Sequence, residues 1–190
     1  MLIRILAFLL ETLFFVLIAA ALLRAWMNGL RINMKAQPGG FVMALTDWLV
    51  KPLRRTLPKA LVQSSLDWAS VLAAALLALA YALLWWLLFG VLLGADLWNF
   101  AGAPVFGVFL LLVFALKMLI RVTLQTLFIL VLGYAIVSWV QPGSPAYSLL
   151  GRLTEPLLTP LRRIIPAIGG IDLSALVLLV LLQVGMMLLA

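Results

Sequence analysis

The stretch A-S-V-L-A-A-A-L-L-A-L-A-Y-A-L-L-W-W-L-L-F-G-V-L-L, from Ala69 to Leu93, contains no charged residue. About 20 apolar residues are enough for a helix to cross a bilayer. In lipid each segment must satisfy its own backbone hydrogen bonds, which a helix or a closed barrel does. The alternating apolar and polar residues of a barrel strand are absent here. This stretch therefore predicts a transmembrane helix.

The composition of the whole chain agrees with a membrane protein. Of its 190 residues, 67% are hydrophobic and only 10% are charged, whereas a soluble domain is about half apolar and about a quarter charged. The formal net charge of +7 is explained by the anionic headgroups of a bilayer. The chain contains no Cys and no His, which removes disulfides, thiolate metal sites and histidine-based catalysis. We expect neither a metal nor a cofactor.

Four apolar stretches predict four transmembrane helices. We expect these spans at about 5–25, 69–93, 122–140 and 173–189. Residues 106–120 are also apolar, but one straight helix over 105–140 would be about 54 Å long, more than a simple crossing needs. We therefore predict a separate interfacial or partly inserted helix at 106–120. A fifth true span is the competing interpretation.

A repeat occupies the basic, proline-containing loops that follow the first and third spans. Thr46 to Pro58 aligns without gaps to Thr154 to Pro166, and both segments contain Pro-Leu-Arg-Arg. A tryptophan closes the span before each loop, and an aspartate opens the span after it. These residues are Trp26 and Asp67 in the first half, and Trp139 and Asp172 in the second half.

The repeat divides the all-α chain into two helix-loop-helix units. We place the first repeat at 1–93, a connection with the interfacial helix at 94–121, and the second repeat at 122–190. Lys and Arg concentrate in cytoplasmic loops, so both basic loops should lie on the cytoplasmic side of a bacterial inner membrane. Four spans allow this, whereas five would invert the second repeat, as in some transporters. Lys117 and Arg121 oppose four spans, which leave them near the outer surface.

The second basic loop also carries a family signature. The string L-T-E-P-L-L-T-P-L-R-R-I-I-P-A-I-G-G-I-D-L-S, from Leu153 to Ser174, closely resembles the signature of the YggT family, called YlmG in cyanobacteria, Gram-positive bacteria and plastids. The resemblance covers nearly the whole chain, although Trp48 replaces the first proline in the first copy. It implies a role in cell division and nucleoid organisation, in assembly of photosynthetic membrane complexes, or in osmotic and ion balance, without an agreed reaction.

The two basic loops are the candidate docking sites. We expect Thr154 to cap a short helix with Glu155 and Pro156 in its first turn. Its arginines would then reach lipid phosphates or a partner protein. A topology signal in a loop folded back onto the spans is the alternative. The candidate docking residues are Arg54, Arg55, Arg162, Arg163, Pro52, Pro58, Pro160 and Pro166.

Carboxylates near the spans have more local explanations. Asp67 and Asp172 are suited to cap the spans that follow them. The alternative is an ion pair with a loop arginine that clamps the loop to its helix. Glu11 is the only acidic residue well inside an apolar run. A proton relay is not supported by one carboxylate without a partner, although intramembrane charges often mark function.

No catalytic constellation appears in the sequence, because the carboxylates are scattered and no nucleophile lies beside a base. We therefore expect no enzyme. The leading hypothesis is an inner-membrane organiser or assembly factor whose basic loops dock anionic lipids, other membrane proteins or a second copy of the chain. No nucleic acid is expected as a partner. The rival hypothesis is a small transporter or channel component in osmotic or ion balance.

Overall fold

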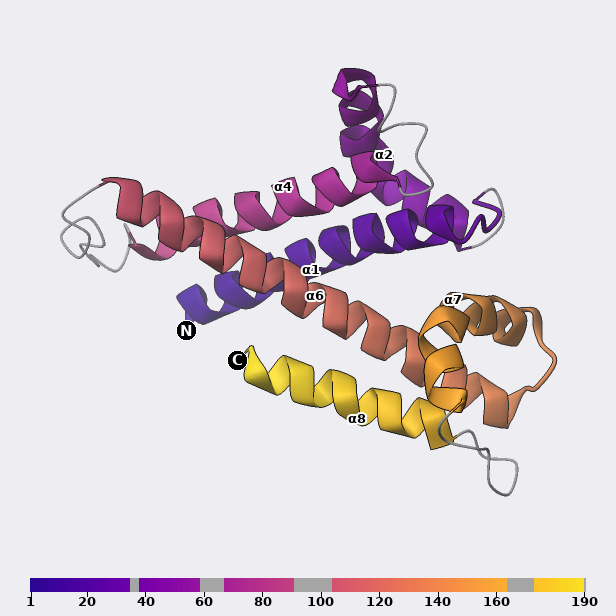
Figure 1. Cartoon of the computed structure of the whole chain (residues 1–190). Coiled ribbons are helices and arrows are strands. Elements are labelled where there is room, and N and C mark those ends of the chain that lie inside the picture. The colour runs from indigo at the N-terminus through magenta and orange to yellow at the C-terminus, as the bar shows by residue number, and fades with distance from the viewer. Residues whose placement is uncertain (35–37, 59–66, 91–103, 164–172, 190) are drawn as a thin grey trace. The chain divides into compact units, whose positions relative to one another are not determined.

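The computed structural model describes residues 1–34, 38–58, 67–90, 104–163 and 173–189. In these ranges the chain is helical and contains no strand. The helices are α1 (Leu2–Gly29), α2 (Gly39–Thr56), α4 (Trp68–Trp85), the π-helical turn η1 (Trp86–Gly90), α6 (Pro104–Val140), α7 (Pro145–Arg162) and α8 (Leu173–Leu188) (Figure 1). The chain forms two compact units, residues 1–122 and 123–190, which are described separately.

Among the described residues, three helices are long and apolar enough to cross a membrane, and a fourth is apolar but shorter. The three are Leu2–Gly29, Trp68–Leu88 and Gly107–Val140. The fourth, α8, has 16 residues. Large apolar side chains such as Phe8 and Phe109 are well exposed on these helices. An apolar surface of this extent requires lipid as its solvent.

In the first unit, α1 and α4 lie side by side (Figure 1). Small residues of α4, including Ala73, Ala74 and Ala78, are buried in the same cluster as Ile18 and Ala21 of α1. Small side chains let two helix backbones approach closely, which is the usual basis of helix packing in lipid. This pair forms the frame on which the polar residues of the unit are placed.

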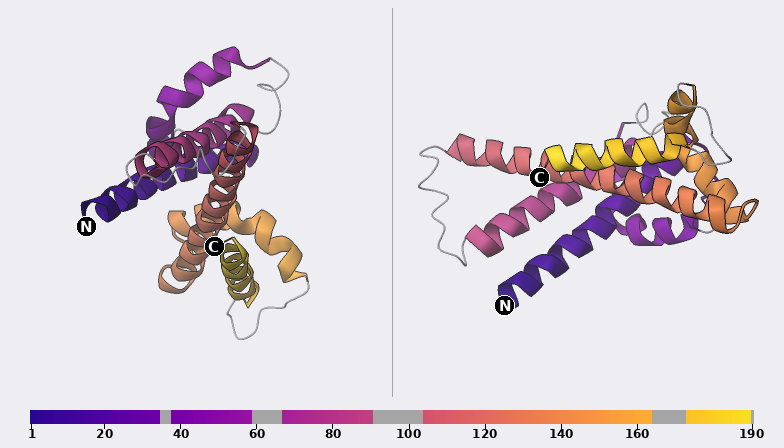
Figure 2. Two further views of the ribbon diagram at one scale, coloured as in Figure 1. Left: turned by 90° about the vertical axis from the view of Figure 1, so that its left-hand side faces the viewer. Right: turned by 90° about the horizontal axis from the view of Figure 1, so that it is seen from below.

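The helix α2 lies at a steep angle to α1 and α4, at the end where α1 finishes and α4 begins (Figures 1 and 2). It packs against both helices and buries Val42, Thr46 and Val50. Leu57, which follows α2, has an extended backbone. Pro58 accounts for this end, because proline disfavours the helical conformation in the residue before it.

The second unit contains the last part of α6 together with α7 and α8. Its core includes Val131, Tyr134, Leu158 and Leu178. Ser144 caps α7, since its Oγ accepts a hydrogen bond from the backbone N–H of Tyr147 at 3.1 Å, and Pro145 follows at the first helical position. Figure 1 shows that α7 is bent, and the prolines inside it remove backbone donors.

The expected break between 106–120 and 122–140 is wrong, because these residues belong to one helix, α6. Its 37 residues correspond to a length of about 55 Å. Neither Gly nor Pro occurs between Val108 and Leu132, so the backbone has no residue at which a helix usually kinks. An interfacial position for 106–120 stays a prediction.

Candidate functional site

The two Pro-Leu-Arg-Arg segments lie at the ends of two similar helices, α2 and α7. Thr46 and Thr154 hold equivalent positions in them, and both side chains are buried. Each threonine Oγ1 donates to the carbonyl oxygen four residues earlier, at 2.7 Å to Val42 and at 2.8 Å to Leu150. Each threonine therefore marks the side of its helix that faces the neighbouring spans.

The position of Thr154 corrects one expectation. Thr154 lies inside α7 and not at its start, where we expected a cap, because Ser144 takes that place. Glu155 is an exposed residue in the middle of the same helix, away from the first turn. The dipeptide Ser144-Pro145 was the signal for the true start, since serine is a favoured cap and proline a favoured first residue.

Asp67 is the centre of a polar cluster in the first unit. Its Oδ2 accepts hydrogen bonds from Nη2 of Arg54 at 2.6 Å, Nδ2 of Asn28 at 2.7 Å and Oγ of Ser70 at 2.8 Å. The carboxylate side chain is only 8% exposed. These three donors come from α2, α1 and α4, so one carboxylate ties three helices together. This contact has the geometry of the loop clamp that we weighed against capping.

The surroundings of Asp67 keep it ionised. Burial acts to raise the pKa of Asp67, but the Ser70 hydroxyl, the Arg54 charge and the Asn28 amide together hold this pKa below its ordinary value of 3.8. The carboxylate is therefore charged at neutral pH, and its ion pair with Arg54 is intact there. Folding stability that comes from such a group is present at neutral pH and is lost in acid.

Arg24 forms a second polar cluster, which we did not predict. Its Nη1 donates to Oγ1 of Thr46 at 2.8 Å and to Oδ1 of Asp47 at 2.9 Å. The Arg24 side chain is 6% exposed, and its Nε has no hydrogen-bond partner among the described residues. A signal existed, because Asp47 is the only acidic residue between Met27 and Leu66.

The carboxylate of Asp47 also binds Lys51, whose Nζ lies 2.8 Å from Oδ2. This hydrogen bond is the largest cause that lowers the pKa of Asp47; desolvation opposes it, and Arg24 adds to it. Asp47 is therefore a charged link between α1 and the outer side of α2.

In the second unit Arg162 contacts a tyrosine. Its Nη2 donates to the hydroxyl oxygen of Tyr134 at 3.0 Å, and its Cζ lies 5.9 Å from the centre of the Tyr134 ring. The Tyr134 ring stacks on Tyr147 with the ring centres 5.5 Å apart. Arg162 thus ties α7 to α6, as Arg54 ties α2 to α4. The predicted residues Asp172 and Pro166 lie outside the described residues.

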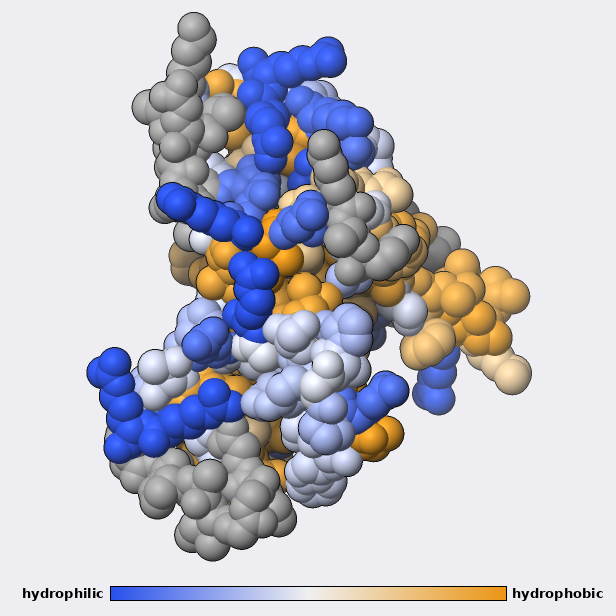
Figure 3. All heavy atoms as spheres, turned by 90° about the vertical axis from the view of Figure 1, so that its right-hand side faces the viewer, coloured by the Kyte–Doolittle hydropathy of each residue, from blue (hydrophilic) through white to orange (hydrophobic). Residues whose placement is uncertain are grey.

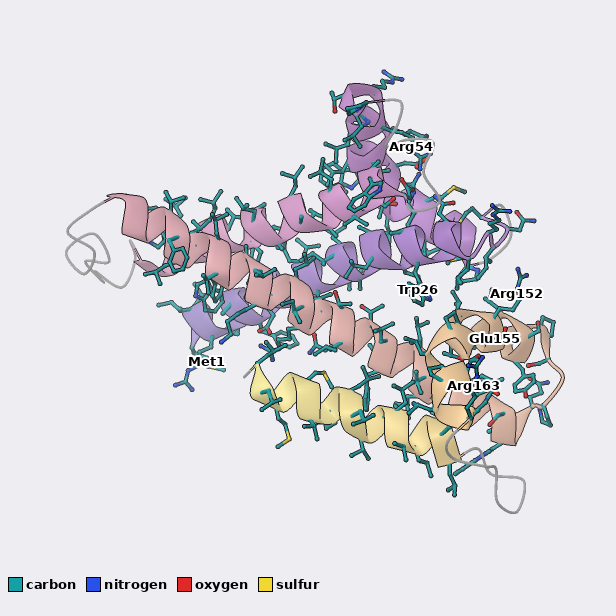
Figure 4. All side chains as sticks on the ribbon, in the orientation of Figure 1. Met1, Trp26, Arg54, Arg152, Glu155 and Arg163 are labelled. Carbon is teal, nitrogen blue, oxygen red and sulfur yellow. The ribbon has the colours of Figure 1, made fainter. Side chains whose placement is uncertain are left out.

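The second arginine of each pair faces outward. Arg55 and Arg163 are exposed, and no hydrogen bond or ion pair of either side chain to a described residue is present. Figure 4 shows Arg54 near the start of α4 and Arg163 at the end of α7. In both Pro-Leu-Arg-Arg segments the first arginine is also exposed, but it binds a neighbouring side chain, whereas the second does not. The exposed prolines of these segments are Pro52, Pro58 and Pro160.

Glu11 has a partner that the sequence did not reveal. Its Oε1 lies 3.9 Å from Nη1 of Arg121, and both side chains are about half exposed. Glu11 belongs to α1 and Arg121 to the part of α6 in the first unit. Opposite charges in apolar helices commonly compensate each other in this way.

We expect the two charges to be energetically coupled. In a double-mutant cycle with Glu11→Gln and Arg121→Gln, the coupling energy should be about 1 kcal/mol, because each single variant leaves one charge unpaired between apolar helices. Unfolding by dodecyl sulfate in maltoside micelles, followed by circular dichroism, gives the four stabilities. Lys117→Gln in place of Arg121→Gln is the control, and an equal coupling for Lys117 would contradict the pairing.

The described residues form contacts that hold helices together, and they expose basic side chains. They contain no group of three or more His, Cys, Asp or Glu side chains that could hold a metal ion. Asp47, Asp67 and Glu11 are each engaged by a basic side chain. This arrangement can hold two amphipathic helices against the apolar helices and present an arginine from each.

Comparison with known proteins identifies similar chains. The family model described as CCB3/YggT matches residues 1–88 and 107–190. The chain is 37% identical to a Vibrio alginolyticus protein named "Uncharacterized protein in proC 3'region", over 93% of this chain and 89% of the relative. It is 35% identical to "Uncharacterized protein YggT" of Escherichia coli strain K12, over 94% of this chain and 86% of the relative. No solved structure matches.

Proposed function

The chain belongs to the CCB3/YggT family, and from this premise we propose that it is a non-enzymatic organiser or assembly factor of the bacterial inner membrane. Its two Pro-Leu-Arg-Arg helices dock anionic lipids or partner proteins at the cytoplasmic surface. One observation carries the proposal: all four arginines are exposed, but in each copy the first binds Asp67 or Tyr134, whereas the second has no hydrogen bond or ion pair with a described residue.

The proposed topology has four spans, formed by α1, α4, α6 and α8. The cations of α2 and α7 support a cytoplasmic position for both helices. The 16 residues of α8 span about 24 Å as a helix, and a short span is tolerated by local thinning of the bilayer. Reporter tags inserted near Lys59 and Ala167 test this topology. Tags found in opposite compartments would show that the second repeat is inverted.

Removing the outward arginines should weaken docking. An arginine near an anionic surface contributes about 1 kcal/mol, so each replacement by glutamine should reduce binding about five-fold. We expect Arg55→Gln/Arg163→Gln to lose crosslinked partners in native membranes and to retain less phosphatidylglycerol after purification. Mass spectrometry of the crosslinked proteins and of the retained lipids measures both effects.

The inward arginines provide the matched control. Arg54→Gln/Arg162→Gln should lower stability, because both arginines hold amphipathic helices against the apolar ones. In detergent the outward pair should leave stability unchanged, within about 0.5 kcal/mol, as expected for exposed residues. Unchanged partner recovery and unchanged lipid retention in the Arg55→Gln/Arg163→Gln variant would remove the docking function.

A small transporter or channel component is the second candidate. The Glu11–Arg121 ion pair favours it, since charges within apolar helices often line ion or substrate pathways. A flux assay with the purified protein in proteoliposomes separates the two functions. Robust movement of ions or solutes, lost in the Glu11→Gln variant, would support the transporter and overturn the organiser.

A further inference from the structure

One exposed face of α2 takes part in only one of the contacts described above, the ion pair of Lys51 with Asp47. Phe41 and Trp48 on this face are 60% and 61% exposed. Phe41, Trp48 and the basic residues that follow them are spaced so that they lie on one side of the helix, because positions three and four apart are neighbours. We call this side the α2 outward stripe, and its members, all exposed, are Phe41, Ala44, Trp48, Lys51 and Arg55.

The stripe combines aromatic and basic side chains on a helix that is not a candidate span. Phe41 and Trp48 precede the cations, and the opposite face of α2 is buried against its neighbours. Figure 3 shows hydrophilic side chains interleaved with hydrophobic ones over this end of the first unit. A helix with this division of residues lies in the membrane interface, with its aromatic side chains at the level of the headgroups.

The indole N–H of Trp48 is already hydrogen-bonded within α2, so the ring can enter an apolar environment. Its Nε1 donates to the backbone carbonyl of Leu45 at 2.9 Å. A buried polar group costs free energy only when it lacks a hydrogen bond. Because the helix itself provides that bond, the ring can leave water with its polar atom paired.

The direction of α2 and its charge both favour an anionic lipid surface. The helix runs at a steep angle to α1 and α4, at the end where α1 finishes and α4 begins (Figures 1 and 2). If α1 and α4 cross the membrane, α2 extends along the membrane surface. Asp47 already binds Arg24 and Lys51, so it does not cancel the charge of Arg55. The stripe thus offers positive charge to phosphate groups.

We propose that the α2 outward stripe inserts Phe41 and Trp48 into the headgroup region of an anionic leaflet, with Lys51 and Arg55 on lipid phosphates. This inference rests on the proposed function and names lipid as the ligand of the first repeat. The second repeat differs, because Pro156 stands at the position of Trp48, and Arg152 at that of Ala44. The insertion is therefore specific to α2.

The matched positions Ala44 and Arg152 allow a direct test. The chain has no cysteine, so Ala44→Cys or Arg152→Cys gives a single site for a nitroxide label in the full-length protein. The labelled proteins are placed in phosphatidylethanolamine vesicles with and without phosphatidylglycerol. Accessibility to oxygen, which concentrates in lipid, is then compared with accessibility to a water-soluble nickel complex.

With phosphatidylglycerol present, we expect a label at position 44 to be reached mainly by oxygen and a label at position 152 mainly by nickel. Adding Phe41→Ser/Trp48→Ser to the Ala44→Cys protein should invert the ratio at position 44. Adding Lys51→Gln/Arg55→Gln should remove its dependence on phosphatidylglycerol. Circular dichroism checks that each variant keeps its helices.

Two results would overturn the proposal. One is a label at position 44 that nickel reaches as readily as a label at position 152, which means that the stripe faces water. The other is a label at position 44 shielded from both reagents, which means that protein covers the stripe. Failure of the stripe is distinguishable from failure of the proposed function, because partner recovery with Arg55→Gln/Arg163→Gln is measured independently of label depth.

Discussion

Replacing Asp47 by alanine is expected to lower the free energy of unfolding by about 3 kcal/mol, because a buried charge that loses its partner is strongly destabilising. Nη1 of Arg24 contacts the Thr46 hydroxyl and the Asp47 carboxylate. In the variant it would keep the hydroxyl contact and lose the carboxylate. Nε of Arg24 already lacks a partner among the described residues. Unfolding by dodecyl sulfate in maltoside micelles, followed by far-ultraviolet circular dichroism, measures the change.

The repeat supplies the control for this variant. Glu155 aligns with Asp47 but is an exposed residue, so Glu155→Ala should change stability by less than about 0.5 kcal/mol. The double variant Arg24→Met/Asp47→Ala should recover part of the loss, because an apolar side chain then replaces the buried charge. Equal losses for Asp47→Ala and Glu155→Ala would contradict a special role for the Arg24 contact.

The positions of the apolar helices could be predicted because lipid imposes a simple rule on sequence. A segment that crosses hydrocarbon must be apolar over its length, and the run that begins at Ala69 satisfies this rule in α4. The rule says nothing about where a helix stops outside the lipid. For this reason α1 extends beyond the expected range 5–25 at both ends, to Leu2 and Gly29.

Proline content misled us about the loops. The basic segments contain several prolines, and we expected loops with at most a short helix near Thr154. Instead α2 and α7 each have 18 residues. Pro52 lies inside α2, and Pro156 and Pro160 lie inside α7. Proline removes one backbone donor and disturbs the preceding turn, but burial of one apolar face stabilises the helix across that defect. Such burial depends on the neighbouring spans, which local sequence does not specify.

Polar contacts were the hardest feature to predict, because their partners are distant in the sequence. The presence of arginines in the loop before Asp67 allowed the clamp as one of two alternatives, but the sequence did not single out Arg54 as the partner. Arg24 has no such signal beyond the scarcity of acidic residues in the segment that follows it. The pairing of Glu11 with Arg121 depends on how α1 and α6 pack, which hydropathy does not determine.

The clamp at Asp67 explains why the first repeat needs a carboxylate at the start of α4. A cap at that place could equally be serine or threonine, because only one acceptor is required. A clamp needs a charged acceptor for several donors, and the Asp67 side chain receives Arg54, Asn28 and Ser70 together. Asparagine keeps the size of aspartate but loses the charge, so Asp67→Asn separates the two roles.

Asp67→Asn should therefore lower the free energy of unfolding by about 3 kcal/mol at neutral pH, since hydrogen bonds to a charged group contribute about 1.5–3 kcal/mol each and are not additive. Because folding holds the pKa of Asp67 below 3.8, this difference from the parent protein should be constant down to about pH 5 and should shrink as the pH falls further. Chemical unfolding of both proteins at a series of pH values measures this difference.

Arg54→Gln should lower the free energy of unfolding less than Asp67→Asn does, because the Arg54 side chain is 42% exposed and can return to water. A cost of Asp67→Asn that persists unchanged in strong acid would show that the carboxylate contributes through its shape alone, and the clamp would then be only a cap.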